Sequence, residues 1–119
     1  ADCTAAFGLH GALIIGPVTL LDAHERDRVT EALADFELTL HCGAEIAARG
    51  RGRDVLDSPA LALRHLAEVL AGQPHATPLQ AGEIVTTGTL TDAWPITAGR
   101  RWHSDYGALG LSALELTIE

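Results

Sequence analysis

A run of alternating apolar and polar side chains near the middle of the sequence constrains the fold most. Residues 36 to 41 place Phe36, Leu38 and Leu40 on one side and Glu37, Thr39 and His41 on the other. This period of two is typical of an antiparallel strand with one buried face. Cys42-Gly43 then predicts a tight turn, because glycine adopts a positive φ at little cost. Residues 44–49 are expected to return as the second strand of a hairpin, with Ile46 and Ala48 sharing one face.

The clearest helix signal begins at Ser58-Pro59. Serine can cap the free amides of a first turn, and proline fits the first helical position because its missing N–H needs no partner there. Leu63, Leu66 and Leu70 then share one face of the predicted helix. Gly72 is expected to end this helix in a left-handed conformation, and two later prolines prevent it from resuming.

Weaker signals mark the remaining segments. The apolar run at residues 9–15 and the segment 84–87 favour strands, and a turn is expected near residues 98 and 99. Residues 114–118 alternate in polarity and predict a terminal strand. Residues 21–34 contain many charges and good helix formers with irregular apolar spacing, so they could form a short helix or a loop.

Together these patterns predict a single domain spanning residues 1–119. Its expected class is α+β, with a mainly antiparallel β-sheet and one or two helices. A chain of this length can bury roughly two thirds of its unfolded surface around one core. The sequence contains no internal repeat and no flexible linker.

The charge balance excludes several classes of function. Eight basic residues against sixteen acidic ones give a formal net charge of −8, which repels phosphate backbones, so no nucleic-acid partner is expected. All eight basic residues are arginine, so no side chain here can form a Schiff base. No apolar stretch of about 18 residues is present, which predicts a soluble, cytoplasmic chain without a membrane partner.

The two cysteines, Cys3 and Cys42, are too few and too far apart for a disulfide framework or a four-thiolate zinc site. Neither lies in a Cys-x-x-Cys pair or beside an evident activating base. We therefore expect inert, free thiols.

Two clusters resemble metal-binding patterns without completing them. His24-Glu25 could open a zinc-protease helix, but Arg28 stands where the second histidine is required. Asp35 and Glu37 could chelate a divalent ion if a third ligand converged on them. For this pair, a solvated strand face is the favoured interpretation.

Two further clusters have ordinary explanations as well. Asp105 could orient His103 for proton transfer, but no nucleophile signature accompanies the pair. Arg49, Arg51 and Arg53 alternate with other residues in a basic loop that could attract a carboxylate or phosphate. We favour polar surface for the first pair and a solvated hairpin exit for the arginines.

The segment from Thr86 to Thr91 is more informative. Hydroxyl side chains and Gly88 follow directly after an apolar stretch, where backbone amides and hydroxyls can converge on an anion. Threonine is also a favoured strand residue, so simple packing is an equally good explanation on chemistry alone.

At this segment the sequence resembles a known family. The stretch 81–91, followed by Pro95-Ile-Thr-Ala-Gly99 and Gly107-Ala-Leu-Gly110, is similar to the closing region of 2-keto-4-pentenoate hydratases and their 4-oxalocrotonate decarboxylase relatives, within the fumarylacetoacetate hydrolase superfamily. Arg49-Gly-Arg-Gly52 and the Ser58-Pro59 helix resemble that family's glycine loop and following helix. Asp57 stands where the family usually has glycine. The resemblance covers nearly all 119 residues, as the C-terminal part of a hydratase-like catalytic domain.

The resemblance implies a fold, a cofactor and one site. The fold would be the C-terminal portion of a mixed, mainly antiparallel β-roll. Family members use Mg²⁺ or Mn²⁺, held by acidic residues upstream of the segment matched here, so no metal ligand is assigned in this chain. Thr87, Gly88 and Thr89 carry over as the element near the substrate, a small 2-oxo or 2-hydroxydienoic acid. The catalytic residues stay unassigned.

Three functions follow from the resemblance. The favoured one is a hydratase-like lyase of aromatic catabolism that acts on 2-hydroxy-2,4-dienoates and is inactive as this chain alone. The alternatives are a 2-oxo acid decarboxylase of 4-oxalocrotonate type and a non-catalytic binding or partner module. Because half of a fold exposes strand edges and core surface, we also expect a homo-oligomer or a missing N-terminal half.

Overall fold

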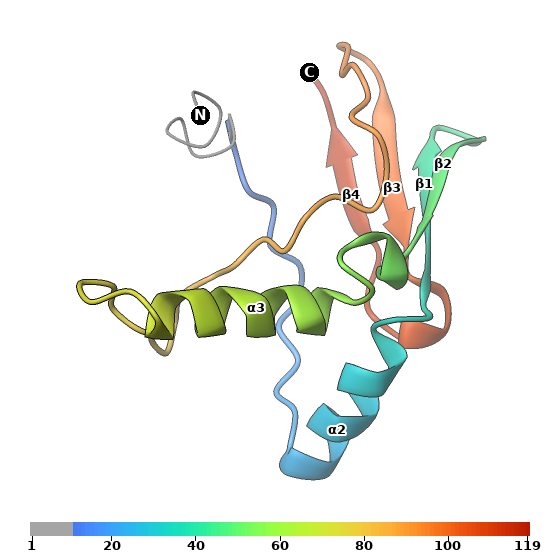
Figure 1. Cartoon of the computed structure of the whole chain (residues 1–119). Helices are drawn as coiled ribbons and strands as arrows, with labels where there is room; N and C mark the ends of the chain where they lie inside the picture. Colours follow the sequence, from blue (N-terminus) through green and yellow to red (C-terminus); the bar gives the residue numbers. More distant parts are fainter. Residues whose placement is uncertain (1–10) are drawn as a thin grey trace.

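A four-stranded antiparallel sheet forms the centre of the computed structural model, which describes residues 11–119. The strands follow the order β2-β1-β3-β4, where β1 is Glu37–Cys42, β2 is Glu45–Arg51, β3 is Arg101–Asp105 and β4 is Leu114–Thr117. Helices α2 (Ala23–Ala32) and α3 (Pro59–Ala71) extend from the sheet in different directions (Figure 1). Short 3-10 turns, η2 (Gly52–Asp54) and η3 (Gly107–Leu109), follow β2 and β3. The α+β, mainly antiparallel architecture predicted from the sequence is confirmed.

The predicted hairpin is present as β1 and β2. Gly43 has a φ of 63° in the connecting turn, as its position suggested. The return strand begins at Glu45 and runs to Arg51, two residues beyond the expected end. Because β1 also pairs with β3, the hairpin supplies one of the two inner strands of the sheet.

One irregularity in the hairpin changes which side chains share a face. Leu40 pairs with Ala48, whereas the next residue, His41, pairs with Ile46, so Ala47 is an extra residue in β2. Paired residues of antiparallel strands point to the same face of the sheet. Ile46 and Ala48 therefore lie on opposite faces, and the prediction that they share one was wrong, because counting along a single strand cannot reveal a bulge.

Both helices begin at side-chain caps. The carboxylate of Asp22 accepts a hydrogen bond of 2.8 Å from the Glu25 amide, and the Glu25 carboxylate accepts one of 2.9 Å from the Asp22 amide. This reciprocal capping box stabilises α2 and shows that the ambiguous segment 21–34 contains a helix. Ser58 caps α3 as expected, since its hydroxyl accepts a 3.2 Å hydrogen bond from the Ala60 amide.

The end of α3 differs from expectation in one respect. The helix ends at Ala71, but Gly72 has a φ of −83° and not the left-handed conformation predicted for it. Its amide donates to the carbonyls of Glu68 and Val69 at 3.1 and 3.2 Å, which closes the last turn in the right-handed sense. The backbone therefore leaves the helix without the change of direction that a left-handed Gly72 would cause.

The sequence patterns missed β3 and correctly predicted β4. In β3, the buried residues Trp102 and Ser104 alternate with exposed Arg101 and Asp105. This period of two was a usable signal, but most of the stretch is polar and its alternation was overlooked. The expected turn before β3 is present, with Gly99 at a φ of 78°.

Two predicted strands do not form. Residues 11–15 of the apolar run 9–15, and residues 84–87, have no regular secondary structure; residues 9 and 10 lie outside the described part of the chain. Ile14 and Ile15 are 46% and 59% exposed. A strand is stabilised by hydrogen bonds to a neighbouring strand, and among residues 11–119 neither segment has one.

Little of the chain is buried for a protein of this size. The buried apolar residues among those described are Phe36, Cys42, Val55, Ala62 and Trp102. The accessible surface is 9165 Å², whereas a compact monomer of this mass exposes about 6200 Å². The buried indole N–H of Trp102 also has no hydrogen-bond partner. These features fit a chain whose apolar surfaces are only partly covered.

The link between η2 and α3 contains two strained residues. Leu56 and Asp57 have φ values of 46° and 67°. A residue with a Cβ in this region costs about 1–3 kcal/mol, with aspartate among the better tolerated, while glycine adopts it freely. The conformation therefore explains why glycine suits position 57, where the resembling family usually has it.

We expect Asp57→Gly to stabilise the protein by about 0.5–1 kcal/mol, since the relief of backbone strain exceeds the added flexibility of the unfolded chain. Asp57→Ala removes the same carboxylate but keeps a Cβ, so it should destabilise by a similar amount. Urea unfolding followed by circular dichroism measures both. Equal effects of the two variants would show that the carboxylate, not φ, controls stability here.

Candidate functional site

The predicted site residues lie in an extended segment beside η2. Thr87 is half-buried, while Gly88 and Thr89 are exposed. Gly88 has a φ of 138°, and a Cβ at that position would lie 3.2 Å from Cγ1 of the buried Val55. The absence of a side chain thus lets the Thr87–Thr89 turn lie against Val55 while leaving its amides and hydroxyls accessible.

A close backbone contact fixes the position of this turn. A Cβ on Gly50, in β2, would lie only 1.9 Å from the carbonyl oxygen of Leu90, one residue beyond Thr89. Gly52, the first residue of η2, makes an equally close approach, where a Cβ would lie 1.8 Å from the carbonyl oxygen of Leu33. The site segment therefore packs onto β2 at Gly50, and the end of α2 packs onto η2 at Gly52.

The spacing of these two glycines was the sequence signal for this contact. A glycine within a strand often marks a place where another backbone approaches closely. From the sequence, Arg49-Gly-Arg-Gly52 was expected to form a loop, but residues 49–51 belong to β2. Its role in holding the Thr87–Thr89 turn was missed for that reason.

A hollow of about 240 Å³ adjoins Thr87. It is lined by side chains of α3 and of the loop that follows it: Leu63, Leu79, Gln80, Glu83, Val85 and Thr87. The carboxylate of Glu83 accepts a 2.7 Å hydrogen bond from the Gln80 amide, which holds its negative charge at the loop. A small acid bound here would place its apolar part against the leucines and its own carboxylate away from Glu83.

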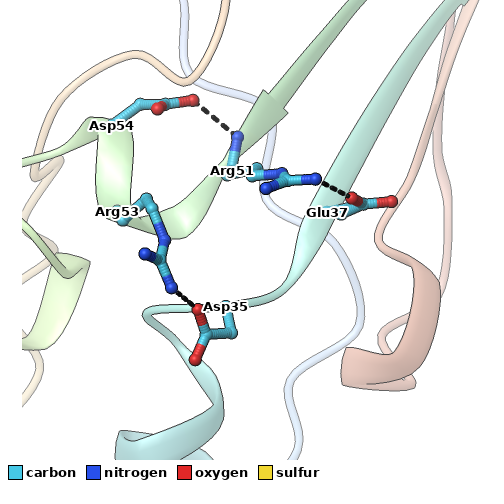
Figure 2. A network of polar contacts seen from close by, with 5 residues as sticks. All are labelled: Asp35, Glu37, Arg51, Arg53 and Asp54. Atoms are coloured by element: carbon cyan, nitrogen blue, oxygen red, sulfur yellow. Dashed lines mark hydrogen bonds and ion pairs between the residues drawn. The ribbon is translucent and has the colours of Figure 1, made fainter.

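Two of the three clustered arginines, Arg51 and Arg53, bind neighbouring carboxylates (Figure 2). Arg51 donates to Glu37 across the hairpin at 2.8 Å, and its amide donates to Asp54 at 2.7 Å. Arg53 forms an ion pair with Asp35. Asp35 and Glu37 thus bind different arginines and do not converge on a metal ion. Exposed pairs of this kind contribute at most about 1 kcal/mol each, so their main effect is to neutralise the basic segment.

The other predicted clusters do not assemble a catalytic centre. His24 and Arg28 both lie on α2, as the incomplete motif suggested. His103 stacks on His41 of the neighbouring strand. Within residues 11–119 no three histidine, cysteine, aspartate or glutamate side chains come together in a way that could hold a metal ion. The same residues contain no helix long and apolar enough to cross a membrane.

The chain matches the model of a known protein family over most of its length. A family model described as fumarylacetoacetate (FAA) hydrolase C-terminal matches residues 2–111. The chain belongs to the fumarylacetoacetate hydrolase family. The resemblance noted in the sequence is thereby confirmed at the level of the family.

Two groups of relatives refine this placement. The 2-keto-4-pentenoate hydratases 1 and 2 of Dechloromonas aromatica (strain RCB) are each 39% identical over 88 residues, covering 69% of this chain and 33% of theirs. Two structures of 4-oxalocrotonate decarboxylase from Pseudomonas putida G7 align with a TM-score of 0.63 at 26% identity, over 74% of this chain and 32% of theirs. One is complexed with calcium and acetate, the other with magnesium and adipate.

The chain therefore spans about a third of the length of the relatives it matches. The decarboxylase structures contain a divalent cation and a small carboxylic acid. The described residues of the present chain do not by themselves fit a site for such a cation. In this fumarylacetoacetate hydrolase family member, the threonine turn lies beside the hollow at Thr87.

We expect Gly50→Ala to destabilise the fold by about 3 kcal/mol, because its methyl group must displace the Leu90 carbonyl and the turn before it. Gly99→Ala is the control, since Gly99 has a positive φ, unlike Gly50, but nothing within 4 Å of its added Cβ. It should cost only about 1 kcal/mol of backbone strain. Urea unfolding of both variants tests this, and equal losses would contradict a structural role for the Gly50–Leu90 contact.

Proposed function

We propose that this chain is the substrate-binding C-terminal part of a hydratase-like lyase that adds water to 2-hydroxy-2,4-dienoates. The 39% identity to two 2-keto-4-pentenoate hydratases carries this proposal. It exceeds the 26% identity to the decarboxylase structures, although the two comparisons cover similar shares of the chain. The activity would belong to the complete protein.

In this proposal the Thr87–Thr89 turn binds the organic acid. Its hydroxyls and free amides are hydrogen-bond donors, and donors held by a fixed backbone favour a carboxylate or a developing enolate oxygen. The contact of Gly88 with Val55 and of Leu90 with Gly50 would hold the donors in place. The leucine-lined hollow beside Thr87 would accept the apolar part of the acid.

The test is hydration of 2-hydroxypenta-2,4-dienoate by the full-length protein with added Mg²⁺, followed as loss of the dienoate absorbance. Thr87→Val and Thr89→Val keep side-chain size but remove a donor. Each should lower kcat/KM by roughly 10- to 100-fold, the effect of losing a hydrogen bond to a charged group. Thr91→Val is the control, because the Thr91 hydroxyl donates to the nearby Asp92 carbonyl instead.

A full-length protein that turns over the dienoate equally well in all four forms would remove the threonine turn from the site. Release of CO₂ from 4-oxalocrotonate without hydration of the dienoate would establish the decarboxylase instead, which the TM-score of 0.63 keeps as the second candidate. No turnover of either acid would favour a non-catalytic binding module.

A further inference from the structure

The sheet has one polar face that the proposed function does not use. Pairing across the strands aligns His41 of β1 with His103 of β3, and His103 with Glu115 of β4. Paired residues point to one face, so these three side chains form a row across three adjacent strands. The opposite face holds Trp102 and its apolar neighbours. The row is thus separated from the buried side of the sheet.

The two histidines are in direct contact. Their ring centroids lie 4.2 Å apart, and the ring planes differ by only 6°. Both side chains are half-buried, so their ring edges remain accessible to water. Two imidazoles held this close by paired strands lose little additional freedom when they bind a common ligand.

The third member of the row is a carboxylate paired with an arginine. Glu115 accepts a 2.5 Å hydrogen bond from the Arg101 guanidinium, which holds the pKa of this carboxyl below its ordinary value. The carboxylate therefore lies beside His103 as one half of an ion pair. The chain as a whole has a formal net charge of −8, which favours the approach of cations.

We infer that His41 and His103 form a two-histidine site for a divalent transition-metal ion such as Zn²⁺, with Glu115 next to it and water completing the coordination. Imidazole nitrogen is a preferred ligand of this class of ion, whereas Mg²⁺ prefers oxygen. The inference does not depend on the proposed hydratase activity. It concerns residues on the opposite side of the sheet from Trp102 and outside the Thr87–Thr89 turn.

Binding requires both rings to turn out of their stacked arrangement. Zn–N bonds of about 2.1 Å at a tetrahedral angle place two ring nitrogens roughly 3.4 Å apart, with their lone pairs directed at the ion. In parallel rings the nitrogen lone pairs lie in parallel planes, so they do not point at one common ion. Rotation about the last side-chain torsion, which is broad for histidine, would let the nitrogens converge without moving either strand.

The test is isothermal titration of the full-length, tag-free protein with ZnCl₂ in excess Mg²⁺, which occupies any oxygen-rich site. We expect His41→Gln and His103→Gln each to weaken one Zn²⁺ binding event at least about tenfold, since even losing an outer-shell partner typically costs roughly 10- to 100-fold. His75→Gln, an exposed histidine after α3, is the matched control and should leave this binding unchanged.

Histidine ring signals in NMR spectra provide a second measurement on the same samples. Zn²⁺ should shift the signals of His41 and His103 together. Zn²⁺ titrations that are the same for the wild type and both glutamine variants would overturn the inference. Weaker binding in only one of the two variants would overturn it as well, because a shared ion requires both rings.

Discussion

The tightest packing in the molecule is the contact of two backbone segments with Gly50 at the end of β2 and Gly52 at the start of η2. The carbonyl of Leu90 lies against Gly50, and that of Leu33 lies against Gly52. No other residue type fits either position without moving the main chain. Through these contacts β2 positions the threonine turn, and η2 positions the end of α2. The location of the candidate site therefore depends on the absent side chain of Gly50.

The sequence predicted the elements whose causes are local. The hairpin turn at Gly43, the cap at Ser58 and the alternation of β4 each depend on a few adjacent residues, and each was found. The predicted strands at 9–15 and 84–87 failed in their described parts because a strand depends on its neighbours in space. The bulge at Ala47 and the ion pairs of Arg51 and Arg53 also involve distant residues, so no one-dimensional pattern could show them.

The candidate site was predicted from the sequence by a different route, and it stays a prediction. Chemistry alone gave threonine packing and anion binding equal weight, and only the family resemblance favoured Thr87–Thr89 as a substrate-binding turn. The structure adds the hollow beside Thr87 and the contacts that hold the turn. It also separates two polar regions, since Arg51 and Arg53 are ion-paired with carboxylates while the histidines of β1 and β3 stack on each other.

The open surface of this chain determines how it would unfold. Denaturant sensitivity and heat capacity both scale with the area that becomes exposed on unfolding. Other domains of this length expose most of their apolar surface only when denatured. In this chain much of that surface already contacts water, as at Leu20 and Val18, which are 90% and 80% exposed. The chain would therefore unfold over a broad range of denaturant and with a small heat-capacity change. A sharp, cooperative transition would require these side chains to be covered.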